Sequence, residues 1–190
     1  AYSDTTGNMG VSQTAVTAGE LVTLDLTAPT LTVVAIASNN SDTELAVIGD
    51  VITLSVTASE DIDSPTVALT GLGSASCSAM VGATVFDCTY TVQSSNNEGA
   101  VAFTVDFSDT AGNVGTQVVA LTTSGSGVEV DLTAPTLTTV SMASDNAGDP
   151  TVANAGDTVT VTIVASEAIE APTVTIAGVS VESSAVVGNG

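Results

Sequence analysis

The sequence predicts an all-β protein built of tandem Greek-key β-sandwiches, with about seven strands in each repeat. The segment DLTAPTLT at residues 25–32 recurs letter for letter at residues 131–138, which sets a period of about 106 residues. A period of that length corresponds to a whole domain. Apolar and polar residues alternate along many short segments, and turn residues interrupt them about every 8–12 positions, as in a Greek-key sandwich. An up-and-down barrel fits the uneven loop lengths less well.

This period divides the chain into three parts. Residues 1–24 form the C-terminal part of one repeat, with a last strand near residues 16–24. Residues 25–130 form a complete repeat, and residues 131–190 the N-terminal part of the next. Residues 1–10 also match residues 106–115, so the chain starts in mid-repeat. We therefore expect an excerpt of a longer polypeptide, with any export or anchoring signal outside it.

The strands of the complete repeat follow from period-2 alternation. They are expected at residues 30–37, 51–58, 66–70, 74–81, 84–92, 100–107 and 116–122. The second of them places Ile52, Leu54 and Val56 on one face. The corresponding segment of the next repeat does the same with Val159, Val161 and Ile163, and no segment shows helical periodicity.

The charge composition excludes several classes of partner. The chain has no Lys, Arg or His, against 21 Asp and Glu, so its formal net charge is -21. Nucleic acids and anionic membrane surfaces both require cationic side chains, so neither is expected as a partner. Without imidazole to activate a hydroxyl nucleophile, and with no motif that pairs a nucleophile with a base, we expect no enzyme.

The same composition favours bound cations. Hydrophobic residues make up 44% of the chain and the mean hydropathy is positive, so we expect a folded protein in spite of the charge. No side chain can pair with the acids, and self-repulsion destabilises a compact state. Counter-ions must therefore come from solvent.

The topology predicts where such a cation would bind. In a seven-strand sandwich, the loops after the second, fourth and sixth strands return to the end at which the chain enters the domain. The acidic and amide residues gathered there are Asp25, Glu60, Asp61, Asp63, Asp109 and Asn113, and the corresponding positions in the next repeat are Asp131, Glu167 and Glu170. Calcium takes six to eight oxygen ligands and tolerates irregular loops better than magnesium does. We therefore expect Ca²⁺ at this end, where it would stiffen the joint between repeats.

A structural interpretation of these residues remains open. Asp25 and Asp131 could cap the turn before a proline, and Asp109 and Asn113 could shape a glycine-containing turn. The acidic loops at residues 38–44 and 144–149 lack the spacing of an EF-hand, so we expect them to be solvated and without metal.

Cys77 and Cys88 flank a candidate two-residue turn at Gly82 and Ala83. In that register the two cysteines lie opposite each other, so we expect a cross-strand disulfide, with two buried free thiols as the alternative. The register makes them a hydrogen-bonded pair, so the pairing could be off by one. A disulfide implies an oxidising, extracellular setting.

Three motifs carry a resemblance to a known family. They are DLTAPT at residues 25–30, GDxxTxxxxASE at residues 49–60 and 156–167, and FSDTAGNVG at residues 107–115. The chain resembles the bacterial Ig-like repeat domains of large extracellular adhesins and surface fibre proteins. This resemblance implies an Ig-like sandwich in an array that acts as an extender, often calcium-dependent, and holds a distal binding domain away from the cell. The absence of Lys excludes a Lys–Asn isopeptide crosslink within this chain.

We expect a structural extender, namely a stalk or filament segment at the bacterial cell surface. Its partners would be neighbouring repeats of the same chain and, if chains assemble, other copies in a fibre, with no membrane insertion in this fragment. The alternative is a module that binds carbohydrate, ice or another surface through the threonine row Thr158, Thr160 and Thr162. Outward-facing Thr is, however, ordinary in strands.

Overall fold

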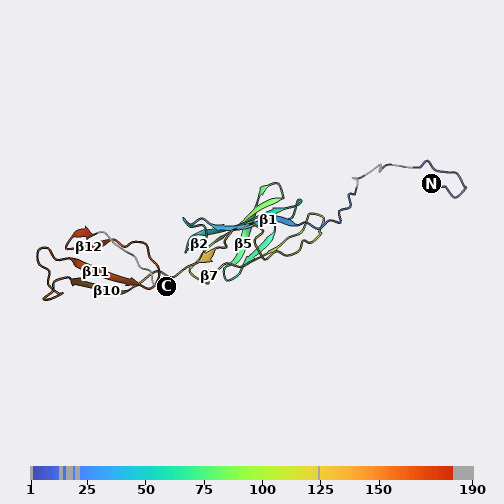
Figure 1. The fold of residues 1–190 in the computed structure, drawn as a ribbon. Coiled ribbons are helices and arrows are strands. Elements are labelled where there is room, and N and C mark those ends of the chain that lie inside the picture. Colours follow the sequence, from blue (N-terminus) through green and yellow to red (C-terminus); the bar gives the residue numbers. More distant parts are fainter. Residues whose placement is uncertain (1, 13–14, 16–18, 20–21, 124, 182–190) are drawn as a thin grey trace. The chain divides into compact units, whose positions relative to one another are not determined.

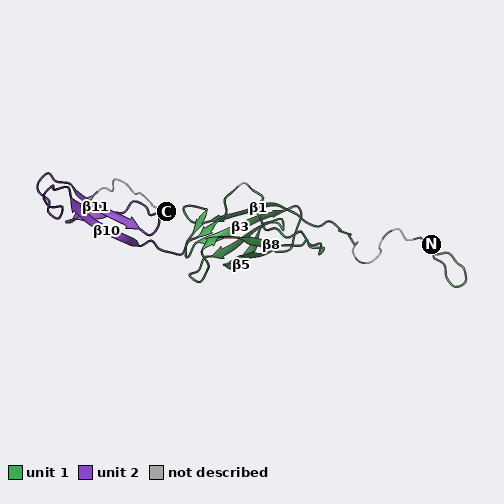
Figure 2. Ribbon diagram, turned by 60° about the horizontal axis from the view of Figure 1, so that its bottom comes forward, with its two compact units in different colours: residues 1–131 green, residues 132–190 purple. Residues whose placement is uncertain are grey.

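The computed structural model describes residues 2–12, 15, 19, 22–123 and 125–181. All regular secondary structure in these residues is β-strand, mostly in antiparallel pairs, as in a β-sandwich. No described segment is a helix that could cross a membrane. The chain forms two compact units, residues 1–131 and residues 132–190 (Figure 2). Of the expected strand at residues 16–24, residues 16–18 and 20–21 lie outside the described residues.

The first unit is built on six antiparallel strands (Figure 1). In spatial order these are β1 (Leu31–Ser38), β3 (Val51–Ala58), β6 (Val85–Thr91), β5 (Gly73–Val81), β4 (Thr66–Leu69) and β8 (Phe103–Asp106). The strand β5 joins two halves of this arrangement. Its first residues pair with β4, and the residues from Ser76 to Val81 pair with β6.

The period-2 alternation correctly located most of these strands. Along β3 every second side chain is buried, and Ile52, Leu54 and Val56 are fully enclosed. The facing surface of the core comes from β4 and β8, where Val67 and Val105 are also buried. The two halves of the sheet thus bury their apolar faces against each other, as alternation predicts for a two-layer arrangement.

The first unit also contains a small second sheet of three strands. Its strands are β2 (Leu45–Ala46), β9 (Glu129–Val130) and β7 (Gly99–Ala100), in the order β2-β9-β7. β9 runs parallel to β2 and antiparallel to β7. Val128 and Val130 are buried, so the segment before the second DLTAPTLT motif belongs to the core of the first unit.

The prediction of a strand at residues 116–122 is wrong, because this segment forms no regular strand. The segment instead bonds to two different strands at separate points. Val118 forms a bridge with Val105 of β8, and the Thr122 amide donates to the Val34 carbonyl of β1. Because the segment passes from one neighbouring strand to the other within five residues, it forms no continuous ladder with either.

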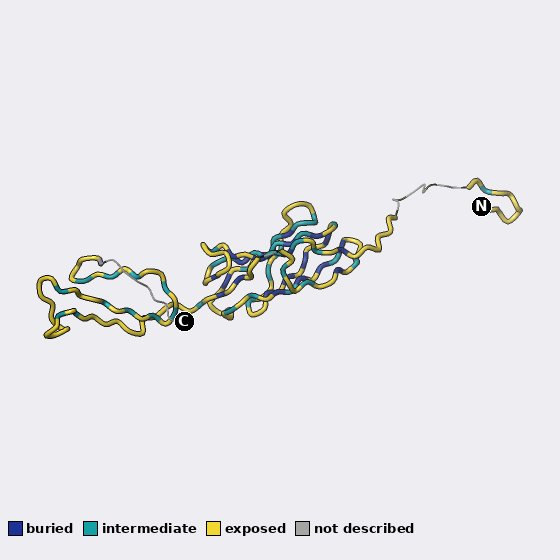
Figure 3. Tube along the Cα trace, viewed as in Figure 1, coloured by how far each residue is buried: buried dark blue, intermediate teal, exposed yellow. Residues whose placement is uncertain are grey.

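The second unit contains two hairpins. β10 (Leu137–Ser144) pairs with β11 (Val159–Ala165), and β12 (Val174–Ile176) pairs with β13 (Val179–Val181). The register of β10 and β11 repeats that of β1 and β3, including the irregularity near the start of the first strand. No described side chain of this unit is fully buried, in contrast to the first unit (Figure 3).

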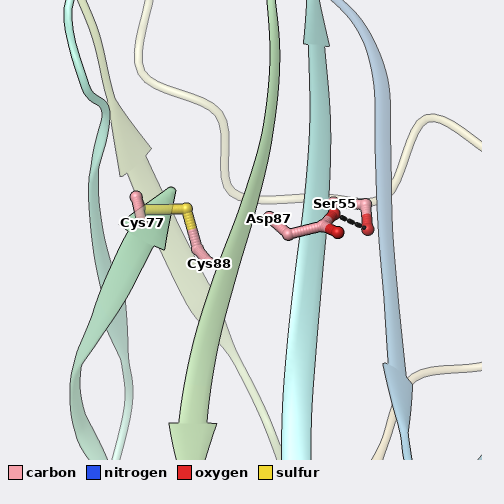
Figure 4. The surroundings of a disulfide bond; sticks show 4 residues. All are labelled: Ser55, Cys77, Asp87 and Cys88. Atoms are coloured by element: carbon pink, nitrogen blue, oxygen red, sulfur yellow. Dashed lines mark hydrogen bonds between the residues drawn. A yellow bond between two sulfur atoms is a disulfide. The ribbon is translucent and has the colours of Figure 1, made fainter. Parts of the chain in front are cut away.

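The predicted cysteine pair forms a disulfide across β5 and β6 (Figure 4). Cys77 lies opposite Cys88, with their Cα atoms 3.9 Å apart. This short spacing is that of a non-hydrogen-bonded pair, so the expected hydrogen-bonded pairing is wrong. The reason is a register shift between Ala79 and Val81, which lengthens the turn and changes the parity of the ladder.

We expect removal of this disulfide to lower the stability of the first unit moderately. The bridge closes a short loop, since its cysteines are 11 residues apart. A loop of that size contributes about 2 to 3 kcal/mol by constraining the unfolded chain. The measurement is urea unfolding of the double variant Cys77→Ala/Cys88→Ala beside the unmodified chain. An unchanged free energy of unfolding would contradict the expectation.

Candidate metal site

The loop after β8 holds a carboxylate in a fixed position. Asp109 is only 2% exposed, and one of its oxygens accepts hydrogen bonds from the backbone amides of Ala111 (2.9 Å) and Asn113 (2.8 Å). The other oxygen accepts a bond of 2.8 Å from the Asn113 side-chain amide. The loop is closed by a backbone bond from Gly115 to Phe107. Asp109 therefore shapes this glycine-containing turn, as the structural interpretation of the sequence proposed.

The same loop geometry occurs at the start of the chain. Asp4 accepts bonds from the Asn8 backbone and side-chain amides, and Gly10 bonds back to Tyr2. Hydrogen bonds, first of all from the Asn8 side chain and then from Thr6, hold the pKa of Asp4 below its ordinary value. Tyr2 is largely exposed, so this loop forms without a surrounding core. The loop is therefore encoded locally by its Asp, Asn and Gly residues.

Three carboxylates from separate segments meet at the end of the first unit where the chain enters it. Asp25 precedes β1, Glu60 follows β3 and Asp109 follows β8. One oxygen of each lies within 4.8 Å of the others. All three belong to the set predicted from the sequence, and the chain contains no Lys, Arg or His that could neutralise them.

Two hydrogen-bonded contacts bring these segments together. Ser59 and Thr30 are joined by the Ser59 backbone amide (2.9 Å) and by the Ser59 hydroxyl, which accepts from the Thr30 amide (3.0 Å). The Asn113 side chain donates to the Asp25 carbonyl at 3.3 Å as well as to Asp109. The segment before β1 is thereby held beside both acidic loops.

The cluster perturbs its own ionisation. Burial, and then the negative charges of Asp25 and Asp109, raise the pKa of Glu60 above its ordinary value of 4.5. The pKa of Asp109 is lowered, chiefly by the hydrogen bond from the Asn113 side chain, against an opposing effect of burial. Of the three carboxylates, Glu60 is therefore the one whose charged form a nearby cation would stabilise most.

The neighbouring charges give a direct prediction for Glu60. In the metal-free chain its pKa, measured by NMR titration of the side-chain carboxyl carbon, should lie above 4.5. Asp25→Asn should lower that pKa, because it removes one negative neighbour. Asp61→Asn, in the same loop but outside the cluster, is the matched control and should have little effect. Equal shifts in both variants would contradict the geometry.

Two other predicted residues of this loop do not join the cluster. Asp61 and Asp63 are exposed, and neither belongs to the group of carboxylates that meet. The residue between them, Ile62, is buried and forms a bridge with Asp109. In an extended segment the neighbours of an inward residue point outward, which explains their position.

Asn113 is another of the predicted ligands, and its side-chain nitrogen is a hydrogen-bond donor at this site. Its amide nitrogen donates to Asp109 and to the Asp25 carbonyl, so it positions the carboxylates. The sequence reasoning missed Ser59, which holds the Glu60 loop against Thr30. The available signal was the repeated Ala-Ser-Glu triplet, since Ser166 accepts a bond from the Thr136 amide in the second unit in the same way.

The corresponding residues of the next repeat are divided between the two units. Asp131 ends the first unit, and its amide donates to the Ala46 carbonyl. Glu167 and Glu170 lie in the second. One carboxylate oxygen of Glu167 is shielded from solvent and accepts no hydrogen bond from the described residues. Shielding such an oxygen without a partner is costly, and a bound cation would remove that cost.

In the acidic loops before β3 and β11, a carboxylate accepts hydrogen bonds from residues of the same loop. Asp50 accepts from the Val47 amide and from the Asn40 side chain, which together lower its pKa. Asp157 makes the equivalent bonds with Asn154 and Asn146. These loops thus repeat one local arrangement, and neither belongs to the acidic cluster found among the described residues.

No protein-family model, curated protein or solved structure matches this chain. The kind of metal that the site would bind is therefore inferred from its own ligand atoms. Three carboxylate oxygens are hard ligands, suited to calcium or magnesium and not to soft metals. Calcium would complete its shell with backbone carbonyls and water.

Proposed function

We propose that this chain is a structural extender, a stalk or filament segment of a bacterial extracellular adhesin or surface fibre, stiffened by calcium at the joints between repeats. The observation that carries the proposal is the meeting of Asp25, Glu60 and Asp109 in a chain without cationic side chains. Three such carboxylates repel one another unless a cation lies between them.

The place of Asp25 in the chain gives the cation a mechanical role. Asp25 lies in the segment that leads into β1, whereas Glu60 and Asp109 belong to loops of the folded unit. A cation bound to all three fixes the leading segment to that unit. Asp131 occupies the position of Asp25 in the sequence repeat, so the same chemistry would act at each successive joint.

The strand arrangement supports Ig-like repeats. Four strands lie in the order β1-β3-β6-β5, and β4 and β8 form the other layer with the segment around Val118. This is the order A-B-E-D and C-F-G of an immunoglobulin-type sandwich. The disulfide suits an extracellular setting. The absence of Lys and Arg also leaves trypsin-like proteases no cleavage site.

A surface-binding role has less support. On β3 the row of Thr53, Ser55 and Thr57 is only partly exposed. Ser55 donates a hydrogen bond of 2.6 Å to Asp87 on the neighbouring strand (Figure 4). The hydroxyl row of the complete repeat is therefore partly engaged within the sheet.

Backbone relaxation in NMR tests the effect of calcium on the leading segment. With calcium, order parameters of residues 22–28 should rise to about 0.85, from values under about 0.6 with a chelator. Glu60→Gln should remove most of this change, and Asp61→Asn should keep it. Order parameters that do not respond to calcium would contradict the proposed joint.

Small-angle scattering tests the extender role. Arrays of two and three copies of residues 25–130 in calcium should differ in maximum dimension by one constant increment per repeat. A three-copy array that is as compact as a two-copy array would contradict an extender.

A further inference from the structure

The loop between β1 and β2 carries the acceptor sequence for N-linked glycans. Asn39, Asn40 and Ser41 match the pattern Asn-x-Ser, in which the first residue receives the glycan. No other asparagine of this sequence is followed two positions later by Ser or Thr. Because so short a pattern also arises by chance, the local geometry decides whether it can be used.

The fold fixes the orientation of the Asn39 side chain. Its Oδ1 atom accepts a hydrogen bond of 2.8 Å from the Val51 backbone amide. A backbone amide can only donate, so the atom that faces it must be the oxygen and not the nitrogen. The Nδ2 nitrogen, which is the atom that receives a glycan, donates no hydrogen bond to any described residue, and Asn39 is exposed. The reactive nitrogen therefore faces solvent.

The other two residues of the pattern divide their roles. Asn40 is half-buried, and its side chain donates a bond of 2.7 Å to Asp50, which anchors the loop. Ser41 is exposed, and its hydroxyl donates one bond of 3.2 Å to the Asn40 side chain. The middle residue thus holds the loop in place, while the acceptor and the hydroxyl residue stay accessible on either side of it.

The second unit shows that the fold does not require asparagine at this position. Asp145 is the equivalent residue, and its Oδ1 atom accepts the corresponding bond of 2.8 Å from the Thr158 amide. The backbone amides of Asn39 and Asp145 also bond back in the same way, to the carbonyls of Val51 and Thr158. Either an amide oxygen or a carboxylate can therefore accept this bond. Only the first unit combines an amide nitrogen here with a hydroxyl two residues later, because position 147 is alanine.

We propose that Asn39 is an N-glycosylation site of the folded first unit, with a saccharide carried on a lipid diphosphate as the donor. The Asn39 Nδ2 nitrogen forms a bond to the anomeric carbon of the saccharide and loses one proton, and the bond from that carbon to the diphosphate oxygen breaks. The glycosylated amide keeps its oxygen, so the bond from Val51 is retained. The disulfide between Cys77 and Cys88 requires an oxidising compartment outside the cytosol, where such transfer takes place.

The test treats the purified, folded 190-residue chain with an oligosaccharyltransferase that accepts Asn-x-Ser and with its lipid-linked donor. We expect one glycan per chain by intact mass, located at Asn39 by peptide mapping. Ser41→Ala should abolish the transfer and Ser41→Thr should retain it, because the pattern requires a hydroxyl at that position. The double variant Asp145→Asn/Ala147→Ser builds the same pattern in the equivalent loop of the second unit, and it should add a second glycan.

A synthetic peptide of residues 36–44 is the control for the sequence without the fold. Transfer to the peptide but not to the folded chain would show that the loop shields Asn39 and would overturn the inference. Transfer to neither would show that the sequence is no acceptor, and transfer that survives Ser41→Ala would place the glycan elsewhere; both would overturn it as well. Calcium ligands take no part in this experiment, so its result is independent of the proposed metal site.

Discussion

Calcium should raise the melting temperature of the first unit by about 15 °C, and Glu60→Gln should remove most of this increase. A ligand at a thousand times its dissociation constant stabilises the folded state by about 4 kcal/mol. For a domain of roughly 100 residues, each kcal/mol shifts the melting temperature by about 4 °C. The carboxylates of Asp25, Glu60 and Asp109 supply the ligands. The measurement is calorimetry in calcium and in chelator.

Asp61→Asn provides the matched control, because it removes the same charge from the same loop outside the cluster. The chain with this substitution should retain the full calcium response. Equal losses in the two variants would show that calcium acts only by screening the net charge. A melting temperature that chelator does not change would contradict the site altogether.

The calcium response should also depend on pH. The raised pKa of Glu60 means that its favourable contribution to the metal-free fold is present below its ordinary pKa and is lost as pH rises through the folded value. Calcium offsets that loss, so its effect should grow as pH rises above about 4.5. The lowered pKa of Asp109 acts in the opposite direction, since its contribution is present above its ordinary pKa and is lost as pH falls through the folded value.

Gly115→Ala should destabilise the first unit by about 3 kcal/mol. A Cβ atom at this position would overlap the ring of Phe107, which is buried in the core. The ring cannot move without displacing its neighbours, and the hydrogen bond from Gly115 to Phe107 closes the loop that holds Asp109. Urea unfolding measures the change.

Gly10→Ala is the matched control, because its Cβ would overlap the ring of Tyr2 in the equivalent loop. Tyr2 is 61% exposed, so its ring can turn into solvent. The change in unfolding free energy of the first unit should stay within about 0.5 kcal/mol. A similar loss from both substitutions would show that the cost lies in the loop backbone and not in the packed ring.

Alternation predicted the central strands well because one face of each is buried. β3 has the bounds expected from its sequence, since four apolar residues alternate without interruption. The two-residue strands β2 and β9 could not be predicted, because their pairing depends on chain segments more than 80 residues apart and not on a local pattern. The segment around Val118 was misjudged for a related reason, since its partners belong to two different strands.

The carboxylate cluster could be predicted in part. Loop connectivity alone indicated that Asp25, Glu60 and Asp109 would lie at one end. It could not separate Glu60 from Asp61 and Asp63, because that depends on Ile62 turning inward beside Asp109. Nor could it assign Asn113 as a donor, which depends on the carboxylate that its amide faces.

An anomalous difference map from crystals of the 190-residue chain grown with calcium would locate any bound ion. A peak between Asp25, Glu60 and Asp109, with an oxygen of each at about 2.3 to 2.6 Å, is the expected result. Carboxylates that have moved apart, with water alone between them, would contradict it.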